Sequence, residues 1–280
     1  MARMAHLEAH ATCHFMEEEV HNSVLISNES DDLDDVDPPP EFNAFTVFDA
    51  LSSSVGSEPK TELNQLKSMG AWEVVDLPEG EKVIPYIVFK EKLDNEGKIQ
   101  TYRFRIVAGG HKQIAGKLYN EMLTAAAKAP SIQVILGNTA VQDWEIHHVN
   151  IKSTYLNAPL KEKVYMKPPP GVLNPGEEGK VCRLLKGLYG LHQAGRGWCK
   201  EMAGVFINKL GFKKSAVDHS VFYQRMKDEH TVVAIATDNM AIALKRLQDV
   251  EKLKDKLCQH WKISDLGELT WYLGFHMCRD

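Results

Sequence analysis

The stretch that most constrains the fold of this chain is residues 231–244, in which two apolar runs rich in β-branched residues flank a polar pair. Because five apolar residues on each side can bury both faces of a strand, the pattern predicts a β-hairpin within a core, with Asp238-Asn239 at its tight turn. A carboxylate held at a rigid tip over a cleft can bind a metal ion. The same pair also fits an ordinary Asp–Asn turn, and the hairpin alone leaves both interpretations open.

Charge is unevenly distributed along the chain. Of the 38 acidic residues, 13 lie within residues 1–59 together with one basic residue, and this part contains an acidic run followed by three prolines. Such a composition buries too little apolar surface to offset the entropy of ordering, so we expect residues 1–57 to form an acidic, largely disordered arm. Residues 60–280 then carry a net charge of +7 within a total of −5, which is compatible with a phosphate-bearing partner.

Cysteine usage and hydropathy limit where the protein can reside. Five scattered cysteines without CxxC spacing are typical of free thiols in a reducing compartment. No apolar run reaches the length of a membrane span, and the N-terminus lacks the apolar core of a signal peptide. We therefore expect an intracellular protein, cytoplasmic or nuclear, with no membrane partner. Nothing in the sequence indicates an oligomeric state.

Helical and strand patterns alternate from residue 62 onward, which predicts an α+β fold. The predicted helices cover residues 62–69, 131–143, 194–210 and 247–261. The predicted strands cover residues 72–77, 83–93, 99–108, 145–152, 181–185 and 269–277. We expect the first three strands to form an antiparallel meander.

Two kinds of polar residue in these elements could carry function. Arg103 and Arg105 occupy alternate positions of a predicted strand and should share one face, where they can clamp a polyphosphate or form a solvated basic surface. Several histidines also invite a metal or acid–base role, but we interpret them as surface or fold residues: His111, His147, His148, His192 and His219.

Six separated blocks follow one another in a fixed order. They read WEVV (72–75), VFK (88–90), YRFRIVA (102–108), VNIKSTYLN (149–157), LYGLHQA (188–194) and DLGEL (265–269). In order and spacing they resemble the reverse transcriptase of copia-type LTR retroelements, over residues 58–280. The resemblance implies a right-hand polymerase fold reduced to fingers and palm, with an antiparallel sheet flanked by helices and no thumb.

The resemblance also implies a metal site. Its three positions fall at Asn150, Asp238 and Asn239, of which only Asp238 is a carboxylate. Polymerisation needs two divalent ions about 3.5–4 Å apart, and Mg²⁺ prefers anionic oxygen ligands. Because two of the three acids are replaced by neutral amides, we expect Mg²⁺ binding to be weak or lost.

Other positions match residues that contact the substrates in this family. Arg103 and Arg105 correspond to basic residues facing the incoming triphosphate, and Tyr155 to the aromatic residue that excludes a 2′-hydroxyl. Gln193 corresponds to a glutamine that contacts the nucleotide. Leu266-Gly267 and the strand after them resemble the hairpin that holds the primer end.

The resemblance therefore predicts a reverse transcriptase-like domain that has lost catalysis. Its implied partners are an RNA or DNA template–primer and a deoxynucleoside triphosphate. One alternative is a non-catalytic module retained for nucleic-acid or protein binding, with the acidic arm as a modulator. A polymerase that is still active is the least favoured interpretation.

Overall fold

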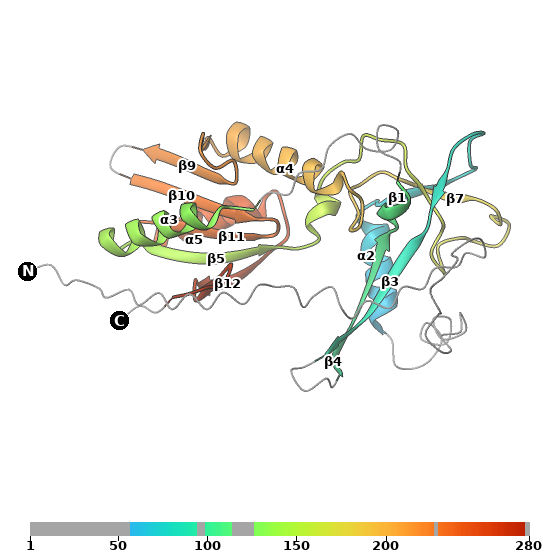
Figure 1. Ribbon diagram of the computed structural model, residues 1–280, viewed down its shortest axis with the longest axis horizontal. Helices are drawn as coiled ribbons and strands as arrows, with labels where there is room; N and C mark the ends of the chain where they lie inside the picture. The colour runs from blue at the N-terminus through green and yellow to red at the C-terminus, as the bar shows by residue number, and fades with distance from the viewer. Residues whose placement is uncertain (1–56, 94–98, 114–125, 227–228, 278–280) are drawn as a thin grey trace, which may run out of the picture. The chain divides into compact units, whose positions relative to one another are not determined.

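The computed structural model describes residues 57–93, 99–113, 126–226 and 229–277, which fall into two compact units (Figure 1). The large-sheet unit comprises residues 126–157, 195–226 and 229–277. The small-sheet unit comprises residues 57–93, 99–113 and 158–194. All of the predicted acidic arm except residue 57 lies outside the described residues, and so do residues 94–98, between the second and third predicted strands.

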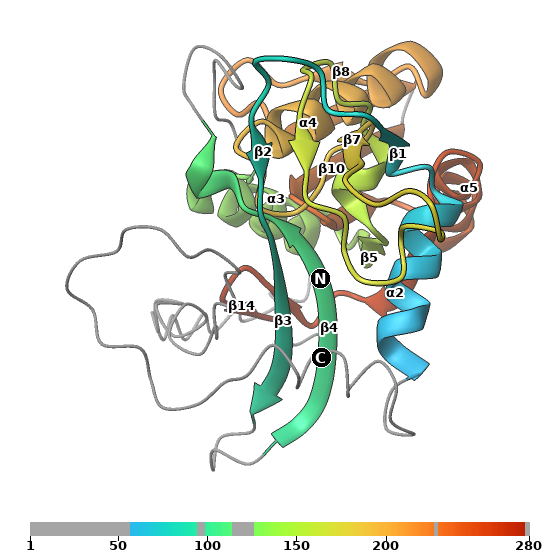
Figure 2. The same ribbon diagram turned by 90° about the vertical axis from the view of Figure 1, so that its right-hand side faces the viewer.

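The small-sheet unit begins with a helix and contains two separate sheets. Its elements are α2 (Ser57–Ser68), β1 (Trp72–Val75), β2 (Val83–Ile84), β3 (Tyr86–Leu93), β4 (Ile99–Ala108), a 3₁₀ turn (Gly110–Lys112), β6 (Tyr165–Met166) and β7 (Val181–Leu184). One sheet has the order β1-β7-β6-β2, with β2 parallel to β6. The other sheet is the antiparallel pair β3-β4, which lie side by side in Figure 2.

The predicted meander is wrong except for its second hairpin, β3-β4. Strand β1 pairs with β7, from a distant part of the chain, and the predicted second strand is broken into β2 and β3 around Pro85. Proline has no N–H for a sheet ladder and a fixed φ, so a continuous strand through this position is disfavoured. Helix α2 also begins earlier than predicted, since Pro59 lies in its first turn, where its missing N–H needs no partner.

The large-sheet unit is built on a six-stranded sheet in which every pairing is antiparallel, as predicted. Its strands are β5 (Glu145–Ile151), β8 (Lys213–Lys214), β9 (Val221–Met226), β10 (Glu229–Ala236), β11 (Asn239–Leu244) and β12 (Ile263–Glu268), in the order β12-β5-β11-β10-β9-β8. Its helices are α3 (Ala129–Gln142), α4 (Ala194–Gly204, followed by a π-helical turn, Val205–Lys209) and α5 (Leu247–Cys258), with a 3₁₀ turn at Thr154–Asn157. No helix in these described ranges has the length and apolar character of a membrane span. The intracellular location stays a prediction.

The end of the chain differs from the predicted strand over 269–277. Instead, β13 (Trp271–Tyr272) and β14 (Phe275–His276) form a short hairpin. Its two turn residues, Leu273 and Gly274, both have positive φ, of 47° and 84°. Such a two-residue turn reverses the chain and matches the twist of the flanking strands, so one strand becomes two.

Both faces of the central hairpin β10-β11 are buried, as its apolar pattern predicts. Residues 240–243 are each at most 2% exposed. On one face, a buried cluster joins Ile132 of α3 and Tyr272 of β13 to three alanines of the hairpin, Ala234, Ala236 and Ala241. On the other face, α5 contacts β5, β11 and β12, and its apolar stripe of Val250, Leu253 and Leu257 is buried. The sheet thus lies between helices, and α+β is the observed class.

Candidate functional site

The turn between β10 and β11 lies one residue earlier than predicted. Ala236 pairs with Asn239, so the two-residue turn is Thr237-Asp238, and Asn239 is the first residue of β11. Thr237 has a φ of 54°, a left-handed conformation that costs a non-glycine residue about 1–2 kcal/mol. Its carbonyl accepts a 2.7 Å hydrogen bond from the indole Nε1 of Trp198, which is 1% exposed. The surrounding core therefore holds the strained turn in place.

Strand pairing brings the three predicted metal-site positions together. Asn239 on β11 lies directly opposite Asn150 on β5, and the backbone N–H of Ile151 donates to the carbonyl of Asp238 at 2.8 Å. Directly opposed residues of an antiparallel pair have Cβ atoms about 4.5–5.5 Å apart, so side chains at these positions meet. We call Asn150, Asp238 and Asn239 the amide cluster.

Hydrogen bonds within the amide cluster satisfy both oxygens of its carboxylate. Asn150 Nδ2 donates to Asp238 Oδ2 at 3.0 Å and to Asn239 Oδ1 at 3.1 Å, while Asn239 Nδ2 donates to Asp238 Oδ1 at 3.0 Å. The ring Nε2 of His148 lies 3.0 Å from Asn239 Oδ1. Because that oxygen can only accept, His148 carries a proton on Nε2. Two neutral amides therefore hold one carboxylate in a closed network.

The side chains of the amide cluster do not supply the ligands that a two-magnesium centre needs. Two Mg²⁺ ions carry four positive charges and need hard anionic oxygens, whereas the cluster supplies a single negative charge. A metal at Asp238 would also have to displace two N–H donors, and Asn239 Oδ1 already accepts two hydrogen bonds. Within the described residues no group of three or more His, Cys, Asp and Glu side chains could hold a metal ion.

Tyr155, Leu266 and Gly267 also lie in the large-sheet unit. Tyr155 is half-buried in the 3₁₀ turn that follows β5. Leu266 and Gly267 form a bulge in β12, where three residue steps oppose two steps of β5. Gly267 has a φ of 75°, and the Leu266 side chain is 52% exposed. The predicted primer-contacting segment is thus part of a strand that was not itself predicted.

The predicted triphosphate contacts lie in the small-sheet unit. Two steps of β3 oppose three steps of β4 between Phe89 and Glu91, and Arg103 lies inside this irregularity. Strand alternation therefore does not by itself place Arg103 and Arg105 on one face, and the side chain of Arg103 lies outside the described part. The Arg105 guanidinium stands 5.0 Å from the ring centroid of Tyr189, a cation–π contact.

Gln193 is held by a residue that sequence reasoning missed. Gln193 is 5% exposed, and its Oε1 accepts a 3.0 Å hydrogen bond from Gln113 Nε2. The Oε1 of Gln113 in turn accepts the backbone N–H of His192 at 3.0 Å. Gly110 and Gly190 were the available signal of this contact in the sequence. A Cβ at Gly110 would lie 1.9 Å from the carbonyl oxygen of Gly190. Only glycine lets the end of β4 dock this closely on the Gln193 loop.

Comparisons with known proteins agree with the sequence blocks. The profile of the family described as reverse transcriptase (RNA-dependent DNA polymerase) matches residues 69–280. The Retrovirus-related Pol polyprotein from transposon TNT 1-94 of Nicotiana tabacum is 31% identical over 221 residues, which are 78% of this chain and 17% of that protein.

Two further relatives show the same pattern. The Pol polyprotein from transposon RE1 of Arabidopsis thaliana is 29% identical over 82% of this chain and 17% of its own length. The Transposon Ty1-GR1 Gag-Pol polyprotein of Saccharomyces cerevisiae is 28% identical over 74% of this chain and 12% of its own length. The chain thus spans less than a fifth of these relatives. Among solved structures, a foamy viral protease-reverse transcriptase in complex with dsDNA has a TM-score of 0.43 at 13% identity, covering 90% of this chain and 46% of that one.

Proposed function

The chain belongs to the reverse transcriptase (RNA-dependent DNA polymerase) family, in the form found in copia-type retroelements, and we propose that it binds template–primer without extending it. In this proposal the large-sheet unit is the palm and the small-sheet unit is the fingers. The amide cluster carries the proposal, because it occupies the family's metal-site positions with one carboxylate.

Loss of catalysis follows from the charge of the amide cluster. Two like dications about 3.5–4 Å apart repel each other strongly, and a polymerase offsets that repulsion with carboxylates at the metal site. Changes in residues that only support metal ligands already cost roughly 10- to 100-fold in affinity or activity. Replacing two of the ligands themselves with Asn150 and Asn239 should cost more. We therefore expect no template-dependent synthesis with Mg²⁺ or Mn²⁺.

Retained binding follows from the same change in charge. Three carboxylates repel a phosphate backbone until metal ions neutralise them, whereas Asp238 alone, held between two amides, repels it much less. Primer–template binding should therefore not require divalent ions. The contacts we propose for it, and for a deoxynucleoside triphosphate, are those named by the family resemblance: Arg103, Arg105, Tyr155, Gln193, Leu266 and Gly267.

Primer extension and binding can be measured side by side on the full chain. We expect no extension of a recessed 3′ end with Mg²⁺ or Mn²⁺, together with salt-dependent binding that persists in excess EDTA. Extension would overturn the loss of catalysis. Absence of binding at low salt would overturn the retained binding.

Reversion of the two amides tests the cause. Asn150→Asp combined with Asn239→Asp should gain Mg²⁺ binding, measured by calorimetry and by Mg²⁺-dependent thermal stabilisation. Asn138→Asp combined with Gln142→Glu is a matched control, since it adds the same charge on exposed positions of α3. Equal Mg²⁺ binding by the reverted and control variants would mean that loss of the two acids is not the main defect.

A further inference from the structure

A fully buried lysine lies under the opposite face of the sheet from the amide cluster. Lys254 of α5 is 4% exposed, although lysine almost never loses contact with water unless its ammonium is paired. It stands beside the apolar stripe of α5, next to Leu253 and one turn from Val250 and Leu257. A charge in such a position needs partners, and these decide what the lysine does.

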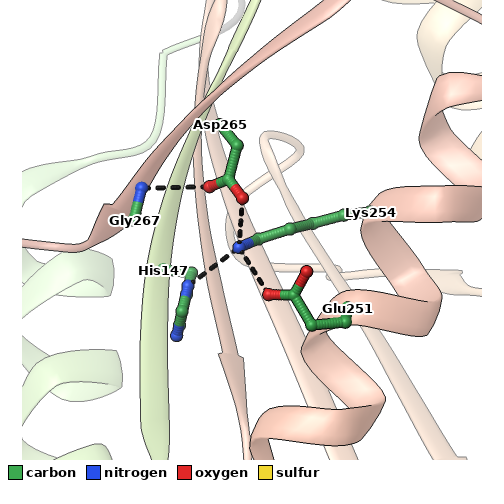
Figure 3. A network of polar contacts seen from close by, with 5 residues as sticks. All are labelled: His147, Glu251, Lys254, Asp265 and Gly267. Atoms are coloured by element: carbon green, nitrogen blue, oxygen red, sulfur yellow. Dashed lines mark hydrogen bonds and ion pairs between the residues drawn. The ribbon is translucent and has the colours of Figure 1, made fainter.

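The ammonium of Lys254 has three partners from three elements, so all its donors are used (Figure 3). Its Nζ lies 2.7 Å from Asp265 Oδ2 on β12, 2.9 Å from Glu251 Oε1 on α5 and 2.9 Å from His147 Nδ1 on β5. We call Lys254, Asp265, Glu251 and His147 the lysine network. It ties the helix to the edge strand and to the strand that carries Asn150.

His147 accepts rather than donates in this network. An ammonium has no acceptor, so the Nδ1 of His147 is unprotonated and the proton resides on Nε2. That Nε2 is buried and has no hydrogen-bond partner in the described part of the chain. A buried unpaired donor costs about 1–3 kcal/mol, so the neighbouring contacts must outweigh that cost. Burial, followed by the charge of Lys254, lowers the pKa of His147 and keeps it neutral.

Asp265 connects Lys254 to the bulge of β12. While Oδ2 binds the ammonium, Oδ1 accepts the backbone N–H of Gly267 at 3.0 Å, and Figure 3 shows Asp265 between the two. The bulge falls between Asp265 and Glu268, where regular pairing with β5 is interrupted. A residue without a ladder partner needs another restraint to keep one conformation. The Asp265 carboxylate provides that restraint for Gly267.

The charges of the lysine network support each other. Burial alone would raise the pKa of Asp265, but the hydrogen bonds from Lys254 and the Gly267 backbone lower it. Burial alone would lower the pKa of Lys254, but the bonds to Asp265 and Glu251 raise it. Both groups therefore stay charged around neutral pH, and Asp265 remains fixed in the orientation that holds Gly267.

We propose that Lys254 is a positioning residue that, through Asp265, fixes the Leu266-Gly267 bulge in the conformation that contacts the primer end. The sheet register relates the bulge to the amide cluster, because Ser264, on the same strand as the bulge, pairs with Asn150. The identity of the ligand rests on the proposed function. The restraint on the bulge does not, and it can be measured on the protein alone.

Lys254→Met tests the restraint with a matched control on the same helix. Methionine preserves length and apolar packing but removes the charge, whereas Lys252→Met removes an exposed ammonium two residues away whose side chain is 69% exposed. The first readout is hydrogen exchange at the Gly267 amide. We expect at least tenfold faster exchange in Lys254→Met and less than a twofold change in Lys252→Met, with amides in the centre of β11 unchanged in both.

The second readout is recognition of a recessed 3′ end. The quantity to measure is the ratio of the affinities for a primer–template and for a blunt duplex of equal length. A lysine with a purely structural role would not alter this ratio. This ratio should fall about fivefold in Lys254→Met and stay constant in Lys252→Met. If the parent chain binds neither DNA, the proposed function fails, while the exchange readout still decides whether the bulge depends on Lys254.

Asp265→Asn provides a second route if Lys254→Met does not fold. Its side chain is 46% exposed, and the substitution keeps shape while removing the charge that holds the ammonium. Exchange at Gly267 should again accelerate, and Lys254→Arg, which keeps the charge, should retain at least half of the parent protection factor. Unchanged Gly267 exchange in both Lys254→Met and Asp265→Asn, or an affinity ratio that does not change when exchange accelerates, would overturn the proposal.

Discussion

The two faces of strand β5 treat charge in opposite ways. His148 and Asn150 point to one face, where two neutral amides surround the single carboxylate of Asp238. His147 points to the other, where a buried ammonium meets two carboxylates and a neutral imidazole. Side chains alternate along a strand, so adjacent residues serve these two environments.

The contrast distinguishes charged side chains that stabilise the fold from charged side chains that only catalysis needs. On the face of the amide cluster, two neutral amides donate hydrogen bonds to Asp238, and under the proposed function acids at positions 150 and 239 would serve only the reaction. On the face of the lysine network, Lys254 is buried, so removing a partner leaves a buried charge with less compensation. The predictions below test this difference, beginning with the largest effect.

Asp265→Ala should have the largest effect. It strips the buried ammonium of its shortest contact and frees the Gly267 N–H. Breaking one side of a buried pair costs about 3–5 kcal/mol, and because Asp265 is itself 46% exposed we expect about 2–3 kcal/mol. Denaturant unfolding at pH 7 measures the loss. Asp255→Ala, at an exposed position of α5, should cost less than about 0.5 kcal/mol. Equal costs for the two variants would remove the distinction between the faces.

Asn150→Asp should have the next largest effect, and it should depend on conditions. The new carboxylate would stand about 3 Å from Asp238 in place of a donor, and we expect a loss of about 2 kcal/mol at pH 7 without divalent ions. Millimolar Mg²⁺, or a pH low enough to protonate one carboxyl group, should recover most of it. Asn138→Asp should show neither the loss nor the recovery; a loss that Mg²⁺ and acid leave untouched would point to packing instead.

Acid should weaken the fold through His147. Its pKa is lowered in the folded state, first by burial and then by Lys254, so below about pH 6.5 the unfolded chain takes up a proton that the folded chain refuses. The contribution is fully present above that pH and is lost as pH falls, at no more than about 1.4 kcal/mol per unit. The pKa of Asp265 is also lowered, so that carboxyl adds a loss only at still lower pH, below its ordinary value of 3.8.

Stability measured from pH 8 to 5 in the parent and in His147→Gln checks this prediction. Glutamine can still accept a hydrogen bond from Lys254 but cannot take up a proton. Between pH 6.5 and 5, the dependence of the unfolding free energy on pH should therefore become weaker, by up to the equivalent of one bound proton. An identical slope in both proteins would exclude His147 as its source.

Thr237→Gly should have the smallest effect, and it should stabilise the protein. Glycine removes the strain of a φ of 54° but makes the unfolded chain more flexible, which leaves a net gain of about 0.5 kcal/mol. Thermal unfolding of the two proteins under the same conditions measures the gain. A loss instead would mean that contacts of the threonine side chain outweigh the backbone strain.

Much of the site could be read from local sequence, whereas its surroundings could not. The family resemblance predicted that Asn150 and Asp238 lie in one site. The apolar runs of residues 231–244 predicted the hairpin that carries Asp238 at its turn. The turn was misplaced by one residue because Asp-Asn favours turns, while the pairing of Ala236 with Asn239 decides where the strands end. The meander failed because the partner of β1 lies in β7, a pairing that no local pattern indicates.

Lys254 was overlooked although the sequence held a signal. Positions 250, 253, 254 and 257 form one stripe of a helix, so a lysine at 254 falls on the buried side. The sequence analysis predicted the helix over residues 247–261 but did not single out its lysine. The partners of the Lys254 ammonium were not predictable from the helix pattern, because Asp265 and His147 reach it from different strands.

The sequence by itself determined the family of this chain, because the family is recognised from residue identities along short blocks. The same blocks place two amides and one acid at the predicted metal-site positions. Only the tertiary structure decided which residues Asn150 and Lys254 bind. Asn150 binds a carboxylate 88 residues away, and Lys254 binds a histidine 107 residues away. Such partners depend on sheet register and helix docking, which are properties of the whole fold and of no single segment.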